Sequence, residues 1–569
     1  MNVNLKGKAE HTFDAIVVGS GISGGWAAKE LCQKGLKTLV LERGRDVKHV
    51  AGYSTTNSTP WQLSHQNMPT REMLANQAVQ ARTGYTIKPA SAEYFVNDLE
   101  HPYIEEKRFD WMRGYHTGGR SLLWGKQSYR MSPIDFEANA RDGIAIPWPI
   151  GYDELAPWYD YVEKFAGISG SKEGLDILPD GQFQSPMALT PAELDLKRSV
   201  EAKWPGRKVI PGRAAHLTAP TEEQIALGRS ACLYRNLCIR GCPYGAYFSS
   251  QAATLKAAEI TGNMTLRPHS IVHSVIFDDK SDKAVGVRLI DELTMETTEY
   301  FAKIIFLNAS TVASTSILMN SKSNRFPEGM DESGALGGYL MDHHLGVGAS
   351  GVIDGHRDKT TYGRRPNGFY IPRFRNHSEK PNGDYIRGYG YQGKGMRQDW
   401  TREIDGFGAD FKKQLTSFGP WSVGMGGFGE CLPYENNRIS LHPERWDKWG
   451  LPLVVANAEF KQNEVNMRVD MMNDAVEMLE AMGATNISSH NKPPSIGLGI
   501  HEMGTARMGD SPKNSVLNKW NQVWGAPNVF CTDGSAMVSS GCQNPSLTYM
   551  ALTARAVDHA VSESKKGNL

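Results

Sequence analysis

Hydrophobic and polar positions follow strand and helix periods in several separate parts of the chain. Residues 13–46 read as a buried strand (14–18), a tight turn, a helix from about 23 to 34 and a second strand, TLVLE. Three further strand-like runs lie within 264–307, and turn formers spread over 345–430 favour antiparallel strands joined by loops. Amphipathic patterns predict helices over 462–483 and 545–564. The chain therefore mixes helices and strands along its whole length.

A phosphate-binding fingerprint occupies the first turn. Gly19 permits the tight turn, Gly21 lets the backbone approach a pyrophosphate, and Gly24 allows the helix to pack closely on the strand. The helix N-terminus directs its positive end at the phosphates. Glu42 closes the second strand, where a carboxylate can accept from a ribose 2′-hydroxyl; this excludes NADP but leaves FAD and NAD open. The candidate dinucleotide-binding residues here are Gly19, Ser20, Gly21, Ile22, Gly24, Glu42 and Arg43.

Charge and length change this picture little. Lys and Arg together number 62, as do Asp and Glu, so a net charge of zero gives no reason to expect nucleic acid or an anionic membrane as a partner. The longest apolar runs are strand-length, far short of the roughly 20 residues of a membrane helix, so no membrane insertion is expected. The N-terminal stretch MNVNLKGKAEHTFD has neither an apolar signal core nor a twin arginine, and by itself indicates a cytoplasmic protein.

Three of the seven cysteines gather in one short segment, CLYRNLCIRGCPYGAY. Iron–sulfur clusters are held by thiolates from short, turn-rich segments, often with Pro after the last cysteine, as here. Cys232, Cys238 and Cys242 suit a three-iron cluster, or a four-iron cluster that lacks one protein ligand. On spacing alone, zinc with a distant fourth ligand stays open, and so does a site without metal, with a disulfide and one free thiol.

Three further stretches resemble signatures of the glucose-methanol-choline (GMC) oxidoreductases. They are GGRSLLWG at 118–125, NASTVASTSILMNS at 308–321, and the C-terminal run that begins HEMGTARMG and continues through VFCTDGSAMVSSGCQNPSLTYMALTARA. Together with the first turn, they keep the family's order from residue 14 to residue 557. The resemblance implies FAD in an extended pose and an enzyme that moves a hydride from an alcohol carbon to the flavin.

The resemblance also implies which residues surround the FAD. The loop at 118–125 is expected to border the isoalloxazine ring, the backbone at Val272 the adenine, and the pair at 533–534 the pyrophosphate and ribityl chain. Leu123 stands where some relatives carry the histidine that attaches FAD covalently, so non-covalent FAD is expected. The candidates implied in this way are Gly118, Gly119, Ser121, Trp124, Val272, Asp533 and Gly534.

Catalysis is expected from the C-terminal block. His501, in HEMGT, matches the family's catalytic histidine and would take the hydroxyl proton. Asn544 matches its partner, which is His or Asn among relatives. Asn544 and Pro545 also read as the N-cap and first residue of a helix whose N-terminus, directed at the flavin, would stabilise negative charge on the reduced ring. His343 and His344, in YLMDHH, lie near family positions and are secondary pocket candidates.

The predicted fold class is α/β (α+β). Nucleotide-binding pieces occur at both ends and in the middle of the chain, which predicts a Rossmann-like FAD-binding domain interleaved with a substrate domain. The resemblance implies that the substrate domain is built on an antiparallel β-sheet. The FAD-binding segments are placed at 10–50, 105–130, 225–335 (with the cysteines at 232–242) and 495–569, and the substrate, or cap, segments at 51–104, 131–224 and 336–494.

Bacterial FAD-dependent sugar dehydrogenases of this family share the cysteine spacing and its C-P-x-G-A ending. The resemblance therefore implies a 3Fe-4S cluster that passes electrons from the flavin to a cytochrome c or another acceptor. We predict oxidation of a secondary hydroxyl of a sugar or glycoside, with C3 of glucosides favoured. The alternatives are glucose 1-dehydrogenase or gluconate 2-dehydrogenase activity, an oxygen-using sugar or alcohol oxidase, a lyase that keeps FAD as a relic, and a non-catalytic subunit.

Partner and location are also expectations from the resemblance. Related large subunits are exported bound to a small subunit that carries a twin-arginine signal. A small-subunit partner and a periplasmic location are therefore expected, in contrast to the cytoplasmic location that this chain indicates by itself.

Overall fold

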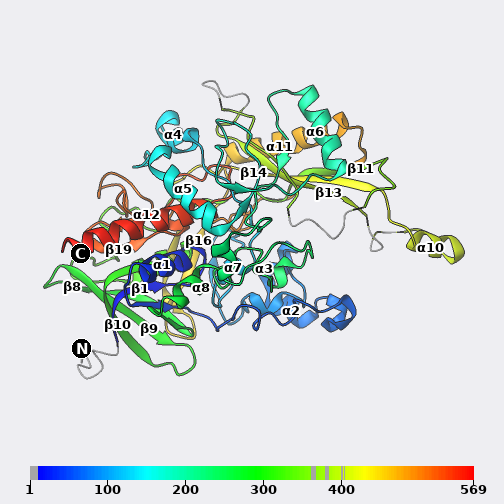
Figure 1. Cartoon of the computed structure of the whole chain (residues 1–569). Helices are drawn as coiled ribbons and strands as arrows, with labels where there is room; N and C mark the ends of the chain where they lie inside the picture. The colour runs from blue at the N-terminus through cyan, green and yellow to red at the C-terminus, as the bar shows by residue number, and fades with distance from the viewer. Residues whose placement is uncertain (1–10, 361–366, 378–383, 399–401, 403) are drawn as a thin grey trace.

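The computed structural model describes residues 11–360, 367–377, 384–398, 402 and 404–569. Figure 1 shows two main sheets in separate halves of the molecule, with β1 and β8–β10 at the lower left and β11, β13 and β14 at the upper right. Parts of two expected domain segments lie outside the described residues, namely residue 10 and the gaps within 336–494. Residues 1–10, which supplied most of the argument about an export signal, also lie outside them.

The first sheet, called here the parallel sheet, is built around β1 (Thr12–Val18). Five of its strands run parallel, in the order β19–β10–β1–β2–β7. All four residues of β2 (Thr38–Leu41) are buried, because parallel sheets are covered on both faces; this is why their apolar runs do not alternate. The other parallel strands are β7 (Met264–Arg267), β10 (Thr297–Leu307) and β19 (Ala526–Cys531).

Antiparallel strands and helices complete this half. β8 (Ser270–Asp278) pairs with β9 (Lys283–Asp291), which pairs with β10. The helix after the first turn, α1 (Ile22–Gln33), is buried along most of its length. It packs against α12 (Ser546–Lys565) and α8 (Thr254–Ile260), so helices from both ends and the middle of the sequence meet here.

The second sheet, called the antiparallel sheet, has the order β17–β11–β14–β13–β12–β6. Burial alternates residue by residue along β14, as expected of a strand with one covered face. Helices α11 (Gln462–Ala481) and α6 (Pro191–Lys203) pack on this sheet and on each other. The strands are β6 (Ile210–Pro211), β11 (Val347–Ile353), β12 (Phe369–Ile371), β13 (Tyr389–Arg397), β14 (Trp421–Gly429) and β17 (Thr485–Asn491).

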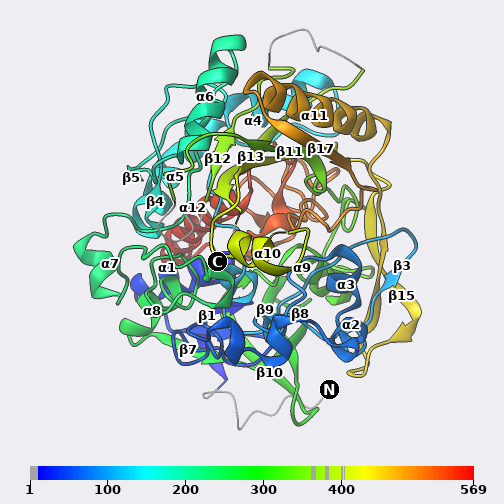
Figure 2. The ribbon, with the colours of Figure 1, turned by 90° about the vertical axis from the view of Figure 1, so that its right-hand side faces the viewer.

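Most of the remaining strands and helices are short and lie outside the two main sheets. Figure 1 shows α10 projecting at the right of the molecule, and Figure 2 views the molecule from that side. None of the described helices combines the length and apolar character that crossing a membrane requires. The remaining strands are β3 (Ile104–Glu105), β4 (Ile168–Ser169), β5 (Phe183–Gln184), β15 (Arg438–Trp446), β16 (Pro452–Asn457) and β18 (Gln522–Val523). The remaining α-helices are α2 (Arg71–Asn76), α3 (Ala78–Thr83), α4 (Pro133–Asp142), α5 (Tyr152–Ala166), α7 (Glu222–Ala226), α9 (Thr311–Asn320) and α10 (Gly408–Leu415).

The two sheets draw on alternating stretches of the sequence. The strands of the parallel sheet come from residues 12–41, 264–307 and 522–531, and those of the antiparallel sheet from 210–211 and 347–491. The mixture of α and β elements and the antiparallel second sheet agree with the predicted fold class. The residue boundaries proposed for the two domains stay predictions.

Candidate active site

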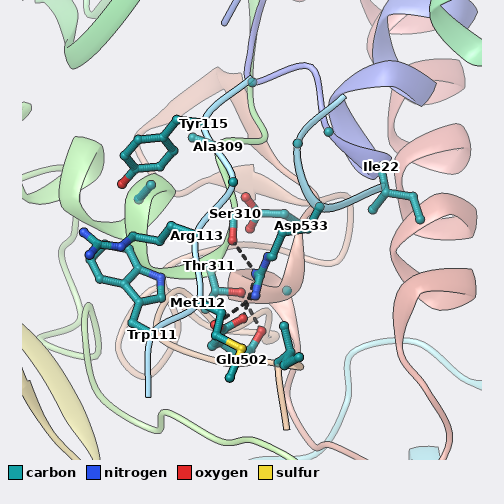
Figure 3. A pocket seen from close by; sticks show the side chains of 18 of the residues that line it. Ile22, Trp111, Met112, Arg113, Tyr115, Ala309, Ser310, Thr311, Glu502 and Asp533 are labelled. Carbon is teal, nitrogen blue, oxygen red and sulfur yellow. Dashed lines mark hydrogen bonds and ion pairs between the residues drawn. The ribbon is translucent and has the colours of Figure 1, made fainter. Parts of the chain in front are cut away.

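A cavity of about 450 Å³ runs from the turn after β1 to the C-terminal block. Both halves of the molecule line it, since its lining includes Gln392 of β13 and Phe428 of β14 as well as the Gly21 turn. Figure 3 shows Ile22, Ser310, Thr311, Glu502 and Asp533 around this space, with Trp111 to Arg113 beside them. The predicted site residues that line the cavity are Gly19, Ser20, Gly21, Ile22, Glu42, Arg43, Gly119, Ser121, Trp124, Val272, His501, Asp533, Gly534 and Asn544.

Gly24, Gly118 and Pro545, which were predicted with them, do not line the cavity. A Cβ atom on Gly24 would lie 1.8 Å from the carbonyl oxygen of Gly19, and one on Gly118 would lie 2.1 Å from the side chain of Gln251. Close packing therefore requires these two glycines. A Cβ atom on Gly21 would meet nothing nearer than 4.0 Å, so this glycine borders open space.

The start of α1 and Asn308 supply free hydrogen-bond donors to the end of the cavity near the Gly21 turn. The N-cap Gly21 offers no side-chain cap, which leaves the first N–H groups of the helix available. The Oδ1 atom of Asn308 accepts from the Thr532 hydroxyl (2.8 Å), while its buried Nδ2 atom has no hydrogen-bond partner among the described residues. A bound phosphate would satisfy both sets of donors, so these residues fit the pyrophosphate of FAD.

Glu42 is positioned by its own strand end. Its Oε2 atom accepts from the backbone N–H (3.1 Å) and the hydroxyl (2.5 Å) of Ser20, and its Oε1 atom accepts from the N–H of Gly44 (3.0 Å). Burial raises the pKa of Glu42. The Oε1 atom keeps a free lone pair for a ribose hydroxyl. With Val272 lining the same cavity, this end fits the adenosine half of FAD.

An ion pair between a partly exposed arginine and a buried glutamate lines the cavity. Arg120 donates through Nη1 and Nη2 to the two carboxylate oxygens of Glu502, at 3.0 and 2.7 Å, and through Nη2 to the Ser310 hydroxyl at 3.0 Å. Ser310 precedes α9 and has φ +82° and ψ 153°, a backbone conformation that residues other than glycine rarely adopt. Such strained residues persist where the surrounding structure holds them, most often at functional sites.

His501 and Asn544, the predicted base and its partner, come together at the other end. The Nε2 atom of His501 lies 3.3 Å from Nδ2 of Asn544. Its Nδ1 atom lies 2.9 Å from Nδ1 of His343. Gln392 donates through Nε2 to Oδ1 of Asn544 at 2.5 Å. Gln392, which no motif marked, and His343, a secondary candidate from the sequence, therefore join the pair.

Asp342 fixes the loop that carries His501. Its carboxylate accepts from the backbone N–H groups of His343 (2.8 Å), Gly497 (2.8 Å), Gly499 (2.9 Å) and His501 (2.9 Å). Because all four bonds converge on one buried carboxylate, the segment before β11 and the segment that ends at His501 are tied together.

The electrostatic surroundings of His501 keep its imidazole neutral. Burial, together with His343 and the positive charge of Arg120, holds the pKa of His501 well below 6.5. A neutral imidazole is the form that can accept a proton. His344, the other secondary candidate, is buried and packs its ring against Phe460, with 4.6 Å between ring centroids, and it does not line the cavity.

The expected helix start at Asn544 and Pro545 is wrong in detail. Helix α12 begins at Ser546, the N-cap position is Pro545, and no side chain caps the first turn. The amide of Asn544 instead accepts from Gln392 and contacts His501, and it does not cap the helix N–H groups.

The remaining site residues differ in how clearly the sequence marks them. Arg120 lies inside GGRSLLWG and Glu502 follows His501 directly, so both residues belong to motifs that the sequence shows. Gln392 has no such signal, because it lies in a glycine- and tyrosine-rich strand and reaches the site only through the packing of the two halves.

The three clustered cysteines line a second cavity, distinct from the one that fits FAD. Cys232, Cys238 and Cys242 are free and partly buried, and together with His216 they line a small cavity of about 30 Å³. The Nε2 atom of His216 lies 3.6 Å from Sγ of Cys238. Within the described part of the chain, no three His, Cys, Asp or Glu side chains converge closely enough to hold one metal ion.

Family models and curated proteins agree on the kind of protein. The N-terminal GMC oxidoreductase model matches residues 13–344, and the C-terminal model matches 433–553. A 2-methyl-1,2-propanediol dehydrogenase of Mycolicibacterium austroafricanum is 30% identical over 96% of this chain and 94% of its own. The fructose dehydrogenase large subunit of Gluconobacter japonicus is 24% identical over 97% and 98%, and the paromamine 6′-oxidase of Streptomyces fradiae is 26% identical over 95% and 90%.

Solved structures show the same fold. Pyridoxine 4-oxidase from Mesorbium loti has a TM-score of 0.57 at 15% identity, covering 96% of this chain and 99% of its own. A formate oxidase from Aspergillus oryzae RIB40, studied for the modification of its FAD, has a TM-score of 0.59 at 13% identity, covering 98% and 99%. The predicted fold class is confirmed. The chain therefore belongs to the GMC oxidoreductase family, and it is an FAD-dependent oxidoreductase that acts on CH–OH groups.

Proposed function

We propose that this enzyme is a sugar dehydrogenase that oxidises a secondary hydroxyl, with C3 of glucosides as the best candidate, and that its electrons leave through a 3Fe-4S cluster to a cytochrome c or another acceptor. One observation carries the proposal. Cys232, Cys238 and Cys242 line a single cavity, beside the cavity that fits FAD.

The arrangement of the cysteines supports the proposal of a cluster over that of a single ion. In a three-iron cluster each thiolate binds a different iron, so the three sulfur atoms need not converge on one point, as a zinc site would require. Burial raises the pKa of the Cys232 thiol to about 11, so this cysteine is protonated until a metal displaces its proton. When loaded, the cluster would supply one-electron transfer between the flavin and an external acceptor.

Aromatic side chains connect the two cavities. Tyr247 donates from its hydroxyl to the carbonyl oxygen of Ser121, which lines the FAD cavity (2.7 Å). The Tyr247 ring stacks on that of His216 with 5.9 Å between centroids, and His216 reaches Cys238. This contiguous path supports electron transfer from one cavity to the other.

A buried lysine, Lys126, lies between the FAD cavity and the cysteine cavity. Lys126 lines the FAD cavity and places its ammonium 4.1 Å from the centroid of the Tyr247 ring. Burial lowers the pKa of Lys126, whereas the three cysteines, as thiolates, would raise it. A lysine near thiols favours the thiolate form, which is the form that binds metal.

The chemistry of the FAD cavity fits an alcohol substrate. FAD, when bound, accepts the hydride that leaves the alcohol carbon. His501 takes the hydroxyl proton, and Asn544 holds the same oxygen, which aligns the C–H bond for transfer. Leu123 lines this cavity with a hydrocarbon side chain that offers no nucleophile, which supports non-covalent FAD.

The relatives favour two substrate classes. Fructose dehydrogenase and gluconate 2-dehydrogenase support a sugar or sugar acid. The 2-methyl-1,2-propanediol dehydrogenase, at 30% identity, supports a small diol as the second candidate. The paromamine 6′-oxidase relative keeps an oxygen-using enzyme as a further alternative.

Partner and location follow the same reasoning. One relative is described as a large subunit, which supports the proposal that this chain also has a small-subunit partner. We further propose export bound to that subunit, and hence a periplasmic location.

The test combines substrate, acceptor and metal. Holoenzyme produced anaerobically with full iron supply is mixed with methyl glucoside, glucose, fructose, gluconate or 2-methyl-1,2-propanediol, and the reduction of FAD, cytochrome c and oxygen is followed. We expect methyl glucoside to give a 3-keto product and the oxidised protein to show the paramagnetic signal of a three-iron cluster. Cys238→Ser should keep FAD reduction but slow cytochrome c reduction.

Cys32→Ser is the matched control, because Cys32 is buried in α1 away from the cysteine cavity. It should leave both rates unchanged. Protein that contains zinc or no metal would refute the cluster, oxygen consumption that matches FAD reduction would favour an oxidase, and preference for the diol would replace the sugar.

A further inference from the structure

A chain of hydrogen bonds runs through four side chains of the active site and ends on a backbone carbonyl. It starts at Gln392, passes to Asn544 (2.5 Å), then to His501 (3.3 Å) and His343 (2.9 Å). The last contact joins Nε2 of His343 to the carbonyl oxygen of Gly541 at 2.8 Å. The chain crosses from the antiparallel sheet to the C-terminal block.

The carbonyl oxygen sets the direction of every bond. It can only accept, so Nε2 of His343 carries a hydrogen. Burial lowers the pKa of His343 to about 4, so the ring is neutral near pH 7 and its Nδ1 atom is an acceptor. The only ring atom of His501 in contact with that acceptor is Nδ1, which must therefore be the donor.

The direction continues to the substrate end. With the proton on Nδ1, the neutral ring of His501 has a bare lone pair on Nε2. Asn544 must then direct its NH₂ group to Nε2, because its oxygen would face another acceptor. Its oxygen accepts from Gln392. The four bonds thus have one consistent direction, set by the Gly541 carbonyl.

We propose that His343 is a positioning residue that holds His501 in the tautomer with a bare Nε2 atom, and that Gln392 orients the amide of Asn544 toward that atom. The inference rests on the FAD-dependent oxidation of CH–OH groups, not on the proposed sugar or the cluster. His343 itself is fully buried, uses both ring nitrogens and does not line the cavity, so it acts through His501.

The arrangement accounts for both the hydroxyl proton and the hydride that leave the alcohol. The 3.3 Å contact between Asn544 and His501 is the longest in the chain, and it would have to open to admit an alcohol oxygen between the two side chains. The O–H bond would break as a new N–H bond forms on Nε2, and FAD, when bound, would supply the acceptor for the hydride and its electron pair. The product is a carbonyl compound, and His501 ends as an imidazolium that still donates to His343.

The test uses holoenzyme in three forms. His343→Leu removes the acceptor, His343→Gln keeps an amide oxygen and an N–H group, and His344→Leu is the matched control. His344 is the adjacent residue and equally buried, but it packs on Phe460 and makes no hydrogen bond to His501 in the described structure. FAD content and melting temperature are recorded for each variant, so that a folding defect is recognised.

The first readout is the anaerobic rate of FAD reduction by methyl glucoside and by 2-methyl-1,2-propanediol at several pH values. We expect His343→Leu to slow reduction by about 100-fold. That lies between the roughly tenfold cost of losing an orienting partner and the roughly 10⁴-fold cost of the wrong histidine tautomer. His343→Gln should recover at least about tenfold of this loss, and KM should change less than kcat. His344→Leu should stay within a few-fold of wild type.

The second readout needs no substrate. Nitrogen-15 spectra of histidine-labelled holoenzyme distinguish a protonated from a bare ring nitrogen, and the His501 signals are identified by their loss in His501→Ala. Wild type should show a bare Nε2, and His343→Leu a shifted or mixed signal. A protonated Nε2 in wild type, or a folded His343→Leu enzyme with wild-type rate and pH profile, would overturn the inference. If neither alcohol reduces the wild type, the proposed substrates fail, and the spectra still decide the tautomer.

Discussion

His501 offers a neutral imidazole to the cavity because burial, with His343 and Arg120 nearby, keeps its pKa well below 6.5. An ordinary histidine would be partly protonated near pH 6 and would lose basicity there. The sign of the shift therefore determines how the rate should depend on pH. A lowered pKa extends the pH range in which the base is active toward acid.

We predict that the rate of FAD reduction is constant through neutral pH and falls only when the pH drops well below 6.5, where His501 becomes protonated. His501→Ala should lower the rate by about 10²–10⁴-fold, the usual contribution of a positioned base. Stopped-flow reduction across pH measures both. A variant within a few-fold of wild type, with an unchanged profile, would exclude His501 as the base.

Asn544 shows why a residue can be identified correctly for a reason that is partly wrong. Its sequence context predicted both a hydrogen bond to the substrate and a helix cap. The structure gives its amide to Gln392 and His501, and α12 starts two residues later. Loss of the amide is therefore expected to affect alignment at His501 and not the stability of α12.

Among the elements, the turn between β1 and α1 separates two roles of glycine. Gly24 lies against the Gly19 carbonyl and is needed for the helix to pack on the strand. Gly21 borders open space at the cavity, with φ −66°, which any residue can adopt. Only the bound cofactor would restrict a side chain at Gly21.

We predict that Gly21→Ala leaves the unfolding of FAD-free protein unchanged but weakens FAD binding at least about tenfold, or 1.4 kcal/mol. Gly24→Ala should instead destabilise the FAD-free protein by about 1–3 kcal/mol or more through overpacking. Denaturant titration and FAD fluorescence titration measure the two effects. Equal FAD affinity in Gly21→Ala and wild type would place the pyrophosphate elsewhere.

Local elements were predictable from the sequence because their signals are local. The predicted helix at about 23–34 is observed as Ile22–Gln33, and the one at 462–483 as Gln462–Ala481. The apolar run of β2 was equally clear, since a strand covered on both faces carries no polar positions. Register and sheet order were not predictable, because β10 pairs with β1 across almost 300 residues.

On the scale of the whole molecule, buried charges join the two halves. Arg373, after β12, donates to Glu430, after β14, at 2.7 Å, and lies 3.8 Å from Asp135 of α4. All three side chains are at most 2% exposed. Asp135 also accepts from Gln543 (2.9 Å), the residue before Asn544. The antiparallel sheet is thereby linked to the C-terminal block that contains Asn544.

We predict that Arg373→Met lowers the free energy of unfolding by about 3–5 kcal/mol, because it removes the buried cation beside Asp135 and leaves Glu430 with only Arg387 as an ion-pair partner among the described residues, at 3.5 Å. The loss should grow as the pH rises, since Asp135, whose pKa burial and Glu430 already raise, becomes more fully ionised. Denaturant titrations at acid and alkaline pH measure this. Arg45→Met, which removes an exposed pair with Glu93, should cost only about 0–1 kcal/mol. Equal losses in both variants would contradict the role of Arg373.

The site as a whole was only partly predictable. His501, Asn544 and the Gly19 turn lie in motifs, so the sequence alone marks them. His343 was marked only as a secondary candidate, and Gln392 was not marked at all. Their contacts with His501 and Asn544 join residues more than 150 positions apart, and no spacing in the sequence encodes those contacts.

The interleaved sheets also determine the order in which the enzyme can be assembled during synthesis. The Gly21 turn leaves the ribosome first, Asn308 and Ser310 follow after more than half of the chain, and Asp533 and Asn544 come close to the end. A nascent chain therefore carries only part of the FAD cavity. Translation has to be nearly complete before the flavin can be enclosed, so cofactor loading is a post-translational event.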